Sequence, residues 1–310
     1  MFSLTEIIYG FPCKKIKFIR LSGLEGKAST AKLIQHILNH QNIGCSIYHP
    51  KYNLTKFATK QIKQNIKYII SEYPHPLIKK SINATVKLDI DPDKIAQKIK
   101  VTPKSLSFEY KNINFVTNSP FYFLVNIITV AFDVCSKIGI TTADFVRNIE
   151  YFPEIPGQRE EITNKYKFRT FLDSSKTPLA IKAILHSLSL IPHKKFYIIF
   201  GYSSFWNPTF KSEIGQILIK YADKIFLTSD DLKNETIEKI SQDLFGKNQQ
   251  KITIITNRQD AFNEAVKAAN PSDFIIALGH GRKNYLIQNN TRFPWSEAEA
   301  FRTAFRLKKQ

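Results

Sequence analysis

The stretch Phe18-Ile-Arg-Leu-Ser-Gly-Leu-Glu-Gly-Lys-Ala-Ser-Thr30 decides how the first half of the chain folds. An apolar run over residues 16–21 predicts a buried strand, and apolar residues with helical spacing follow over residues 33–38. Gly23 and Gly26 interrupt the regular structure between them. A strand, a glycine turn and a helix that begins at a lysine form an arrangement in which backbone N–H groups and the positive helix end hold phosphate.

The lysine of this stretch, Lys27, is expected to reach the terminal phosphate oxygens, and both glycines are expected to surround them. The spacing Gly-x-x-Gly-Lys is shorter than the general phosphate-binding loop, and Ala28 stands where a hydroxyl normally meets Mg²⁺. Ser29 and Thr30 are the hydroxyl candidates that remain. The alternative interpretation is an ordinary glycine turn in front of a helix.

Composition indicates a protein with two domains in a reducing compartment. The chain has 310 residues and 43% apolar content, enough for two cores. The apolar run over residues 120–135 is too short and too polar to span a membrane, and the N-terminus lacks the pattern of a secretion signal. The three cysteines are scattered and form no disulfide or zinc pattern. We therefore expect a cytoplasmic location and no membrane span.

The net charge of +19 is densest over residues 51–67. A helix is predicted over residues 54–82, and four lysines fall on one of its faces: Lys56, Lys60, Lys63 and Lys67. Such a face could bind nucleic acid or another polyanion. The segment has no interleaved aromatic residues and no known nucleic-acid motif, so a solvated basic helix is the favoured interpretation.

The second half alternates short apolar runs with amphipathic helical patterns. The predicted strands cover residues 168–172, 196–200, 224–228, 252–255 and 273–278. This alternation predicts an α/β fold with a doubly wound, mostly parallel sheet. Ligands bind such sheets at the carboxyl ends of the strands, so the residues just after each strand are the candidate site residues.

Segments of the first half resemble the Mur ligase family, in particular its UDP-N-acetylmuramyl-tripeptide synthetase branch. Residues 9–12, Tyr-Gly-Phe-Pro, resemble the linker that enters the family's central domain. The loop that follows resembles Gly-Thr-x-Gly-Lys-Thr-Thr, with matches at Gly23, Gly26, Lys27, Ser29 and Thr30. The resemblance fails at Leu24, Glu25 and Ala28.

Segments of the second half resemble the same family in the same order. Pro156-Gly-Gln-Arg-Glu160 resembles the family's Pro-Gly-Arg-Met-Glu junction. The next segment, Asp173-Ser-Ser-Lys-Thr-Pro178, resembles Asp-Tyr-Ala-His-Thr-Pro, with Lys176 in place of the histidine. Thr228-Ser-Asp-Asp-Leu-Lys233 resembles Thr-Ser-Asp-Asn-Pro-Arg, and Gly279-His-Gly-Arg-Lys283 resembles Gly-Lys-Gly-His-Glu. In the last motif a lysine replaces the glutamate.

The resemblance implies a reduced P-loop domain over residues 1–156 and a Rossmann-like domain over residues 157–310. It implies an ATP-dependent ligase that joins an amino acid to a peptidoglycan precursor through an acyl phosphate. The partners would be a nucleotide, a UDP-muramyl-peptide and, if the chain acts with others, another Mur enzyme. The candidate residues are Lys27, Asp173 and Lys176 for catalysis, Gly23, Gly26, Ser29 and Thr30 for the nucleotide, and Asp231, Lys233 and His280 for the substrate.

Several features depart from the family pattern and leave a second interpretation open. The chain starts where the family's central domain starts, and the segment between the glycine loop and residue 114 is short. We find no Glu-x-Ser-Ser magnesium motif there and no counterpart of the family's carbamylated lysine, so the metal ligands are unknown and Mg²⁺ is an open question. Asp89, Asp91 and Asp93 form the one acidic cluster nearby and are expected to cap a helix rather than bind metal. The second interpretation is a degenerate relative that binds a nucleotide or a partner without ligation.

Overall fold

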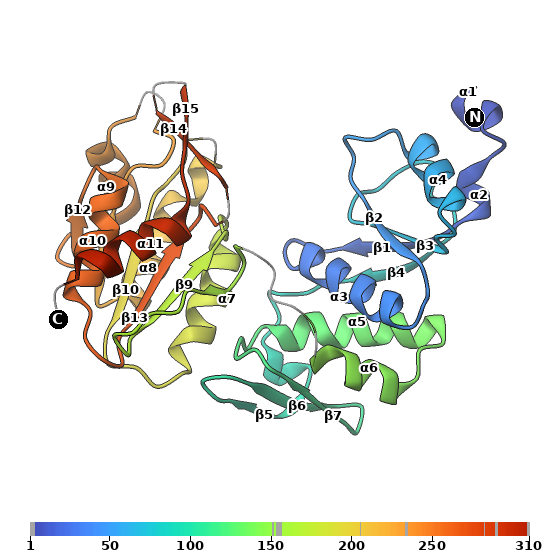
Figure 1. Ribbon diagram of the computed structural model, residues 1–310, viewed down its shortest axis with the longest axis horizontal. Helices are drawn as coiled ribbons and strands as arrows, with labels where there is room; N and C mark the ends of the chain where they lie inside the picture. The colour runs from blue at the N-terminus through green and yellow to red at the C-terminus, as the bar shows by residue number, and fades with distance from the viewer. Residues whose placement is uncertain are drawn as a thin grey trace. The chain divides into compact units, whose positions relative to one another are not determined.

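The computed structural model describes residues 4–150, 152, 157–204, 206–232, 235–281, 283–288 and 291–308. The chain forms two compact units, Met1–Pro153 and Glu154–Gln310 (Figure 1). No helix among these residues is long and apolar enough to cross a membrane.

Unit 1 is built on a parallel sheet with the strand order β2-β3-β1-β4. Its strands are β1 (Lys17–Ser22), β2 (Cys45–Tyr48), β3 (Tyr68–Ser71) and β4 (Ser81–Thr85). The chain passes from β3 on one side of β1 to β4 on the other side. The strand order therefore reverses at β1, which is the point where open parallel sheets bind their ligands.

The helices of unit 1 pack in two groups. Helix α3 packs against α5 and α6, whereas α4 packs against α1, α2 and β2. Three further strands form a small antiparallel sheet. The bounds are α1 (Leu4–Ile8), α2 (Pro12–Lys15), α3 (Lys27–His40), α4 (Leu54–Lys63), η1 (Pro92–Lys94), β5 (Gln97–Val101), β6 (Leu106–Tyr110), β7 (Ile113–Thr117), α5 (Leu124–Ile138) and α6 (Thr142–Glu150).

The helix predicted over residues 54–82 is confirmed over Leu54–Lys63 and is wrong beyond that residue. Helix α4 ends at Lys63, Asn65 adopts a left-handed conformation (φ 58°), and the fully buried strand β3 follows. A short buried strand is a continuous apolar run, and periodicity cannot separate such a run from a buried helical segment. Lys67 consequently precedes β3 and does not share a helical face with the lysines of α4.

Unit 2 contains a six-stranded sheet with the order β12-β11-β10-β13-β9-β8. Every pair in it is parallel except the edge pair β8–β9. The predicted parallel strands and the α/β fold class are thus confirmed. The bounds are β8 (Glu160–Glu161), β9 (Arg169–Asp173), β10 (Phe196–Phe200), β11 (Lys224–Leu227), β12 (Ile252–Ile254) and β13 (Phe274–Leu278).

Helices cover both faces of this sheet, as the crossover rule requires. Helices α7, α8 and α9 carry the chain across the sheet in one direction, and α10 carries it back. Because such crossovers are right-handed, α10 lies on the opposite face from the other three. It packs there with α11 over an apolar core that includes Phe226, Phe262 and Phe301. The bounds are α7 (Pro178–Ser189), η2 (Pro208–Phe210), α8 (Lys211–Tyr221), α9 (Ile237–Phe245), α10 (Arg258–Ala268) and α11 (Glu297–Leu307).

A separate antiparallel hairpin, β14 (Tyr285–Gln288) and β15 (Thr291–Pro294), follows β13 (Figure 1). It lies directly after the strand that was predicted over residues 273–278. The hairpin matters because it carries side chains to the carboxyl end of β13, where the parallel strands of unit 2 end.

Candidate functional site

The glycine loop of unit 1 connects β1 to α3 and has a conformation that requires glycine. Gly23 and Gly26 have φ angles of 120° and 83°, a region that other residues rarely adopt. A Cβ atom on Gly23 would lie 2.0 Å from the carbonyl oxygen of Val86, just after β4. The loop is therefore fixed by close contact with the neighbouring backbone, and the first N–H groups of α3 remain available at its end.

Lys27, the first residue of α3, folds its side chain back over this loop. Its Nζ donates hydrogen bonds to the carbonyl oxygens of Gly23 at 2.6 Å and Leu24 at 3.0 Å. The ammonium group thus lies at the positive end of a 14-residue helix. Backbone N–H groups, a helix N-terminus and a lysine together favour the binding of phosphate.

Neither hydroxyl side chain at the start of α3 is an evident replacement for the hydroxyl group that Ala28 lacks. Ala28 is exposed, whereas Ser29 and Thr30 are buried. The Thr30 hydroxyl donates to the carbonyl oxygen of Gly26 at 2.9 Å, so it bonds within its own helix. At the ends of β1 and β4, the Ser22 and Thr85 hydroxyls form a hydrogen bond of 2.8 Å. These two side chains present exposed hydroxyl oxygens, which could serve as metal ligands, beside the loop.

Glu72 is a residue of this site that the sequence analysis missed. It directly follows β3, the strand beside β1, and is half-buried. Burial raises the pKa of its carboxyl group, and the charges of Lys27, His49 and Lys32 act in the opposite direction. The sequence signal for Glu72 is an acidic residue immediately after an apolar run. The helix that was incorrectly predicted over this segment hid that signal.

Asp91, in the acidic cluster after β4, caps a short helix, as predicted. The Asp91 side chain accepts a hydrogen bond from the N–H of Asp93 at 3.2 Å and caps η1. The Tyr122 hydroxyl donates to Asp91 at 3.0 Å and to Asp93 at 2.6 Å. In the described part of the chain, no group of three or more Asp, Glu, His or Cys side chains could hold a metal ion.

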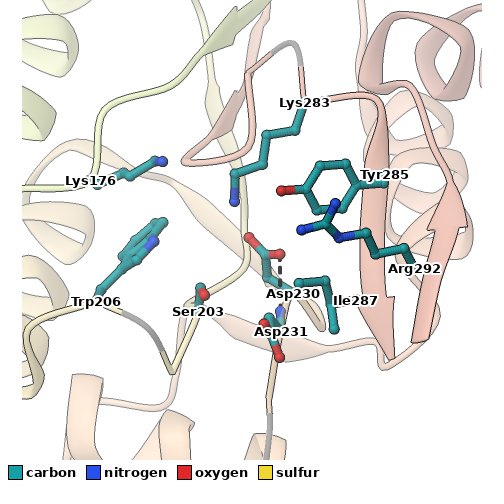
Figure 2. A pocket seen from close by; sticks show the side chains of 9 residues that line it. All are labelled: Lys176, Ser203, Trp206, Asp230, Asp231, Lys283, Tyr285, Ile287 and Arg292. Carbon is teal, nitrogen blue, oxygen red and sulfur yellow. Dashed lines mark hydrogen bonds between the residues drawn. The ribbon is translucent and has the colours of Figure 1, made fainter. Parts of the chain in front are cut away.

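Unit 2 has a pocket of about 470 Å³ at the carboxyl ends of its parallel strands (Figure 2). The segments that follow β9, β10, β11 and β13 contribute to it, together with the hairpin β14–β15. Parallel strands bring these segments together although more than 100 residues separate them, and sheets of this type bind ligands there. The lining residues are Lys176, Ser203, Trp206, Asp230, Asp231, Lys283, Tyr285, Ile287 and Arg292.

Buried acidic groups follow β11 in this pocket. Asp230 and Asp231 are 4% and 5% exposed, and the N–H of Asp231 donates to Asp230 Oδ1 at 3.0 Å. His280 Nδ1 lies 3.7 Å from the same oxygen. Among the residues that the structure describes, the Oδ2 atoms of both aspartates and both ring nitrogens of His280 have no hydrogen-bond partner. Buried polar groups are normally paired, so these atoms indicate a place for a ligand or water.

Asp230 is ionised in this setting. Burial alone would raise its pKa, but the neighbouring His280 ring and the charges of Arg258 and Lys283 outweigh burial and hold the pKa at about 2. The pocket therefore presents a permanent negative charge with an oxygen that is available to a cationic donor.

Basic side chains also line the pocket with these carboxylates. Figure 2 shows the ammonium groups of Lys176 and Lys283 reaching into the same part of the pocket. Burial and the charge of Lys283 lower the pKa of Lys176, whereas Asp230 acts to raise it. The Arg292 guanidinium lies over the Tyr285 ring, 4.5 Å from its centroid. The pocket thus contains both signs of charge.

Asp173 occupies a different position from the other predicted residues of unit 2. It is buried, it is not among the side chains that line the pocket, and burial raises its pKa. Its carboxylate accepts hydrogen bonds from the N–H of Arg159 at 2.9 Å, from the N–H of Ser175 at 2.8 Å and from the Ser175 hydroxyl. Thr177, and not Asp173, caps α7. In the described structure Asp173 therefore holds two turns together.

The remaining predicted residues divide between the units. Gly23, Gly26 and Lys27 come together in the loop of unit 1. In unit 2, Lys176 and Asp231 line the pocket, and His280 lies beside Asp230. Lys233 lies outside the described residues.

Comparisons with known proteins identify relatives of both units. Residues 158–281 match the family described as Mur ligase, glutamate ligase domain. A UDP-N-acetylmuramoyl-L-alanyl-D-glutamate–2,6-diaminopimelate ligase of Prochlorococcus marinus is 30% identical over 168 residues, which cover 52% of this chain and 33% of that protein. UDP-N-acetylmuramyl-tripeptide synthetase 2 of Oceanobacillus iheyensis is 26% identical over 174 residues, 56% of this chain and 35% of that protein. The chain matches between 33% and 50% of the length of such relatives.

Solved structures share the fold of almost the whole chain. MurF ligase from Thermotoga maritima, in complex with ADP, covers 99% of this chain and 84% of its own, with a TM-score of 0.66 and 13% identity. Folylpolyglutamate synthase from Mycobacterium tuberculosis, with ADP and AMPPCP, covers 99% of this chain and 95% of its own, with a TM-score of 0.63 and 10% identity. The sequence comparisons confirm the predicted resemblance to the Mur ligase family, and the structural comparisons confirm the predicted fold class.

Proposed function

From its resemblance to the Mur ligase family, we propose that this chain is an ATP-dependent ligase that adds an amino acid to a UDP-muramyl-peptide. Residues 1–156 would form a reduced nucleotide-binding domain, and residues 157–310 would bind the incoming amino acid. One observation carries the proposal: the glycine loop and Lys27 lie where the strand order reverses, beside the half-buried Glu72. The expected location is the cytoplasm, where ATP and nucleotide-linked precursors occur.

The loop would hold the ATP phosphates through the first N–H groups of α3 and through Lys27. A carboxylate oxygen of the muramyl-peptide would attack the γ-phosphorus, the bond to the bridging oxygen would break, and ADP would leave. The product is an acyl phosphate. Lys27 would stabilise the negative charge on the transferred group, which is the main catalytic task in phosphoryl transfer.

Glu72 is the residue that fits a magnesium site in unit 1. Mg²⁺ commonly binds one or two protein carboxylates together with substrate phosphates and water, so a single glutamate is sufficient when ATP is present. The paired hydroxyls of Ser22 and Thr85 supply further oxygen atoms at the same edge of the sheet. When bound, the metal would neutralise charge on the phosphates. The methyl group of Ala28 cannot contribute a ligand.

The pocket of unit 2 would bind the amino acid. Asp230 and Asp231 would hold its ammonium group, and Lys176 would interact with its carboxylate. His280 and Lys233 are further substrate-binding candidates from the family resemblance. The amine must lose a proton before it attacks the carbonyl carbon of the acyl phosphate. An amide then forms and inorganic phosphate leaves.

A ligation assay tests this proposal. The purified chain is incubated with ATP, Mg²⁺, UDP-N-acetylmuramoyl-L-alanyl-D-glutamate and a mixture of amino acids, and products are analysed by mass spectrometry. We expect a muramyl-peptide extended by one residue, one ADP for each product, and no product from Lys27→Ala. A chain that binds ATP and yields no extended product would overturn the proposal.

A second function, nucleotide binding without ligation, is favoured by Ala28. That residue removes a hydroxyl from the loop, and the Thr30 hydroxyl bonds within α3. A non-catalytic relative could still bind a nucleotide or another Mur enzyme. Its signature would be ATP affinity that does not change with Mg²⁺ and no ADP formation with any muramyl-peptide.

A further inference from the structure

We infer that the pocket of unit 2 selects an amino acid with one ammonium group and an additional carboxylate, and that Lys283 determines this preference. The inference rests on the proposed function and names the substrate class of the same site. It is carried by the charges that line the pocket and by the buried atoms that lack partners.

The negative part of the pocket is formed by two adjacent, buried aspartates. Asp230 and Asp231 are at least 95% buried, and each has one oxygen without a partner among the described residues. The two residues are adjacent, and the N–H of one bonds the carboxylate of the other. They therefore form one acceptor site, which suits a single ammonium group.

The described lining of the pocket has more basic than acidic side chains. Lys176, Lys283 and Arg292 line it, and the structure records no ion pair for them within the described residues. Among the described lining residues, three cations and two carboxylates give a formal charge of one positive. An amino acid with a negatively charged side chain has one ammonium and two carboxylates, so its net charge of −1 complements the pocket.

The location of Lys283 explains why it is the selective residue. It follows β13 and reaches toward Lys176 over Asp230 (Figure 2), and its charge affects both of them. The family motif that this segment resembles has glutamate at this position. A glutamate would leave two cations and three carboxylates, an arrangement that favours a ligand with a second ammonium group. The lysine reverses this preference.

The other walls suit a short apolar chain between the charged groups. Trp206, Tyr285 and Ile287 contribute aromatic and aliphatic surface, and the volume of about 470 Å³ accommodates an amino acid. A dicarboxylic amino acid could place its methylene groups against this surface while its charged ends meet the side chains described above.

Calorimetric titration of the full chain tests the inference without ATP or ligation. The ligands are L- and D-glutamate, L-aspartate, L-glutamine, L-lysine and meso-2,6-diaminopimelate. We expect a glutamate or aspartate to bind about tenfold or more tightly than glutamine, the uncharged isostere, and than both diamino ligands. Equal affinity for glutamine, tighter binding of a diamino ligand, or no binding of glutamate or aspartate would overturn the inference.

Two variants make the test specific. Lys283→Glu should weaken glutamate binding at least tenfold and improve binding of a diamino ligand. Lys182→Glu makes the same charge change at an exposed position on α7 and should leave both affinities unchanged. Thermal unfolding of each variant verifies that it is folded. If a folded Lys283→Glu variant keeps the preference of the unmodified chain, Lys283 is not the selective residue.

The outcomes separate this inference from the proposed function. Selective binding of glutamate or aspartate without ligation would support the selectivity inferred for the pocket and refute the ligase. Ligation of a diamino acid would support the ligase and refute the selectivity inferred for Lys283.

Discussion

The glycine loop of unit 1 and the pocket of unit 2 differ in the physical means by which each would bind the ligand that we propose for it. The loop depends on backbone: two glycines at positive φ, a helix N-terminus and one lysine. The pocket depends on side chains from segments that follow four different strands. A site made of backbone keeps its function when most of its side chains change, whereas a site made of side chains changes its ligand with each substitution. We therefore expect general phosphate binding in unit 1 and a selectivity specific to this chain in unit 2.

The largest effect is expected for the backbone of the loop. Gly23→Ala would place a methyl group 2.0 Å from the Val86 carbonyl oxygen at a φ of 120°. It should lower the free energy of unfolding by about 3 kcal/mol, because strain and overlap add. Chemical denaturation measures this change.

Gly139→Ala is the matched control for that substitution. Gly139 also has a positive φ, 100°, but nothing lies within 4 Å of the added atom. Only backbone strain remains, at about 1 kcal/mol. Equal losses for the two variants would show that contact with Val86 does not fix the loop.

The next effect concerns the one side chain on which the loop depends. Lys27→Ala should weaken ADP binding by about 1.5–3 kcal/mol, roughly tenfold to 150-fold, with little change in stability. Isothermal titration with ADP measures the affinity, and Lys63→Ala, on the exposed face of α4, is the control. An unchanged dissociation constant for Lys27→Ala would show that the loop is a structural turn and does not bind ADP through this lysine.

Glu72 should show opposite effects on stability and function. Its carboxyl pKa is raised in the fold, so its ionisation costs stability as the pH rises from the unfolded value of 4.5 through the folded pKa. Glu72→Gln should therefore unfold at a higher temperature than the unmodified chain at pH 7, with the difference absent well below pH 4.5. The same variant should lose the gain in ATP affinity that Mg²⁺ gives. A variant that is less stable at pH 7 and keeps the response to Mg²⁺ would contradict this role.

The smallest effect is expected at the rim of the pocket. Arg292 is exposed and lies over Tyr285, so solvent screens its charge. Arg292→Ala should weaken glutamate binding only about threefold, a loss below about 1 kcal/mol. Titration calorimetry with glutamate measures it beside Lys283→Glu. A larger loss of glutamate affinity for Arg292→Ala than for Lys283→Glu would show that the selective residue lies on the hairpin.

The sequence predicted the parts of the molecule that local patterns encode. The strands and helices of unit 2, the glycine loop and the Asp91 cap follow from apolar spacing, glycine and capping residues, and the structure contains them. The failure over residues 54–82 has a local cause, because a four-residue buried strand lacks the alternation that identifies longer, half-exposed strands. That error concealed Glu72.

The pocket could be predicted only in part. Lys176, Asp231 and His280 were identified because they follow predicted strands and lie in segments that resemble motifs of the Mur ligase family. Trp206, Tyr285 and Arg292 lie on a loop and a hairpin whose positions depend on tertiary packing, so no local pattern placed them at the pocket. For Asp173 the family resemblance implied catalysis, and no local pattern indicated the hydrogen bonds by which it holds two turns together.

The central claim, that unit 1 activates a carboxylate with ATP, is tested most directly by trapping the acyl phosphate. The chain is incubated with ATP, Mg²⁺, UDP-N-acetylmuramoyl-L-alanyl-D-glutamate and hydroxylamine, without an amino acid, and the muramyl-peptide hydroxamate is measured by mass spectrometry. We predict that hydroxamate and ADP form in equal amounts, and that neither forms with Lys27→Ala. A chain that binds ATP but yields no hydroxamate would contradict the claim and leave nucleotide binding as its function.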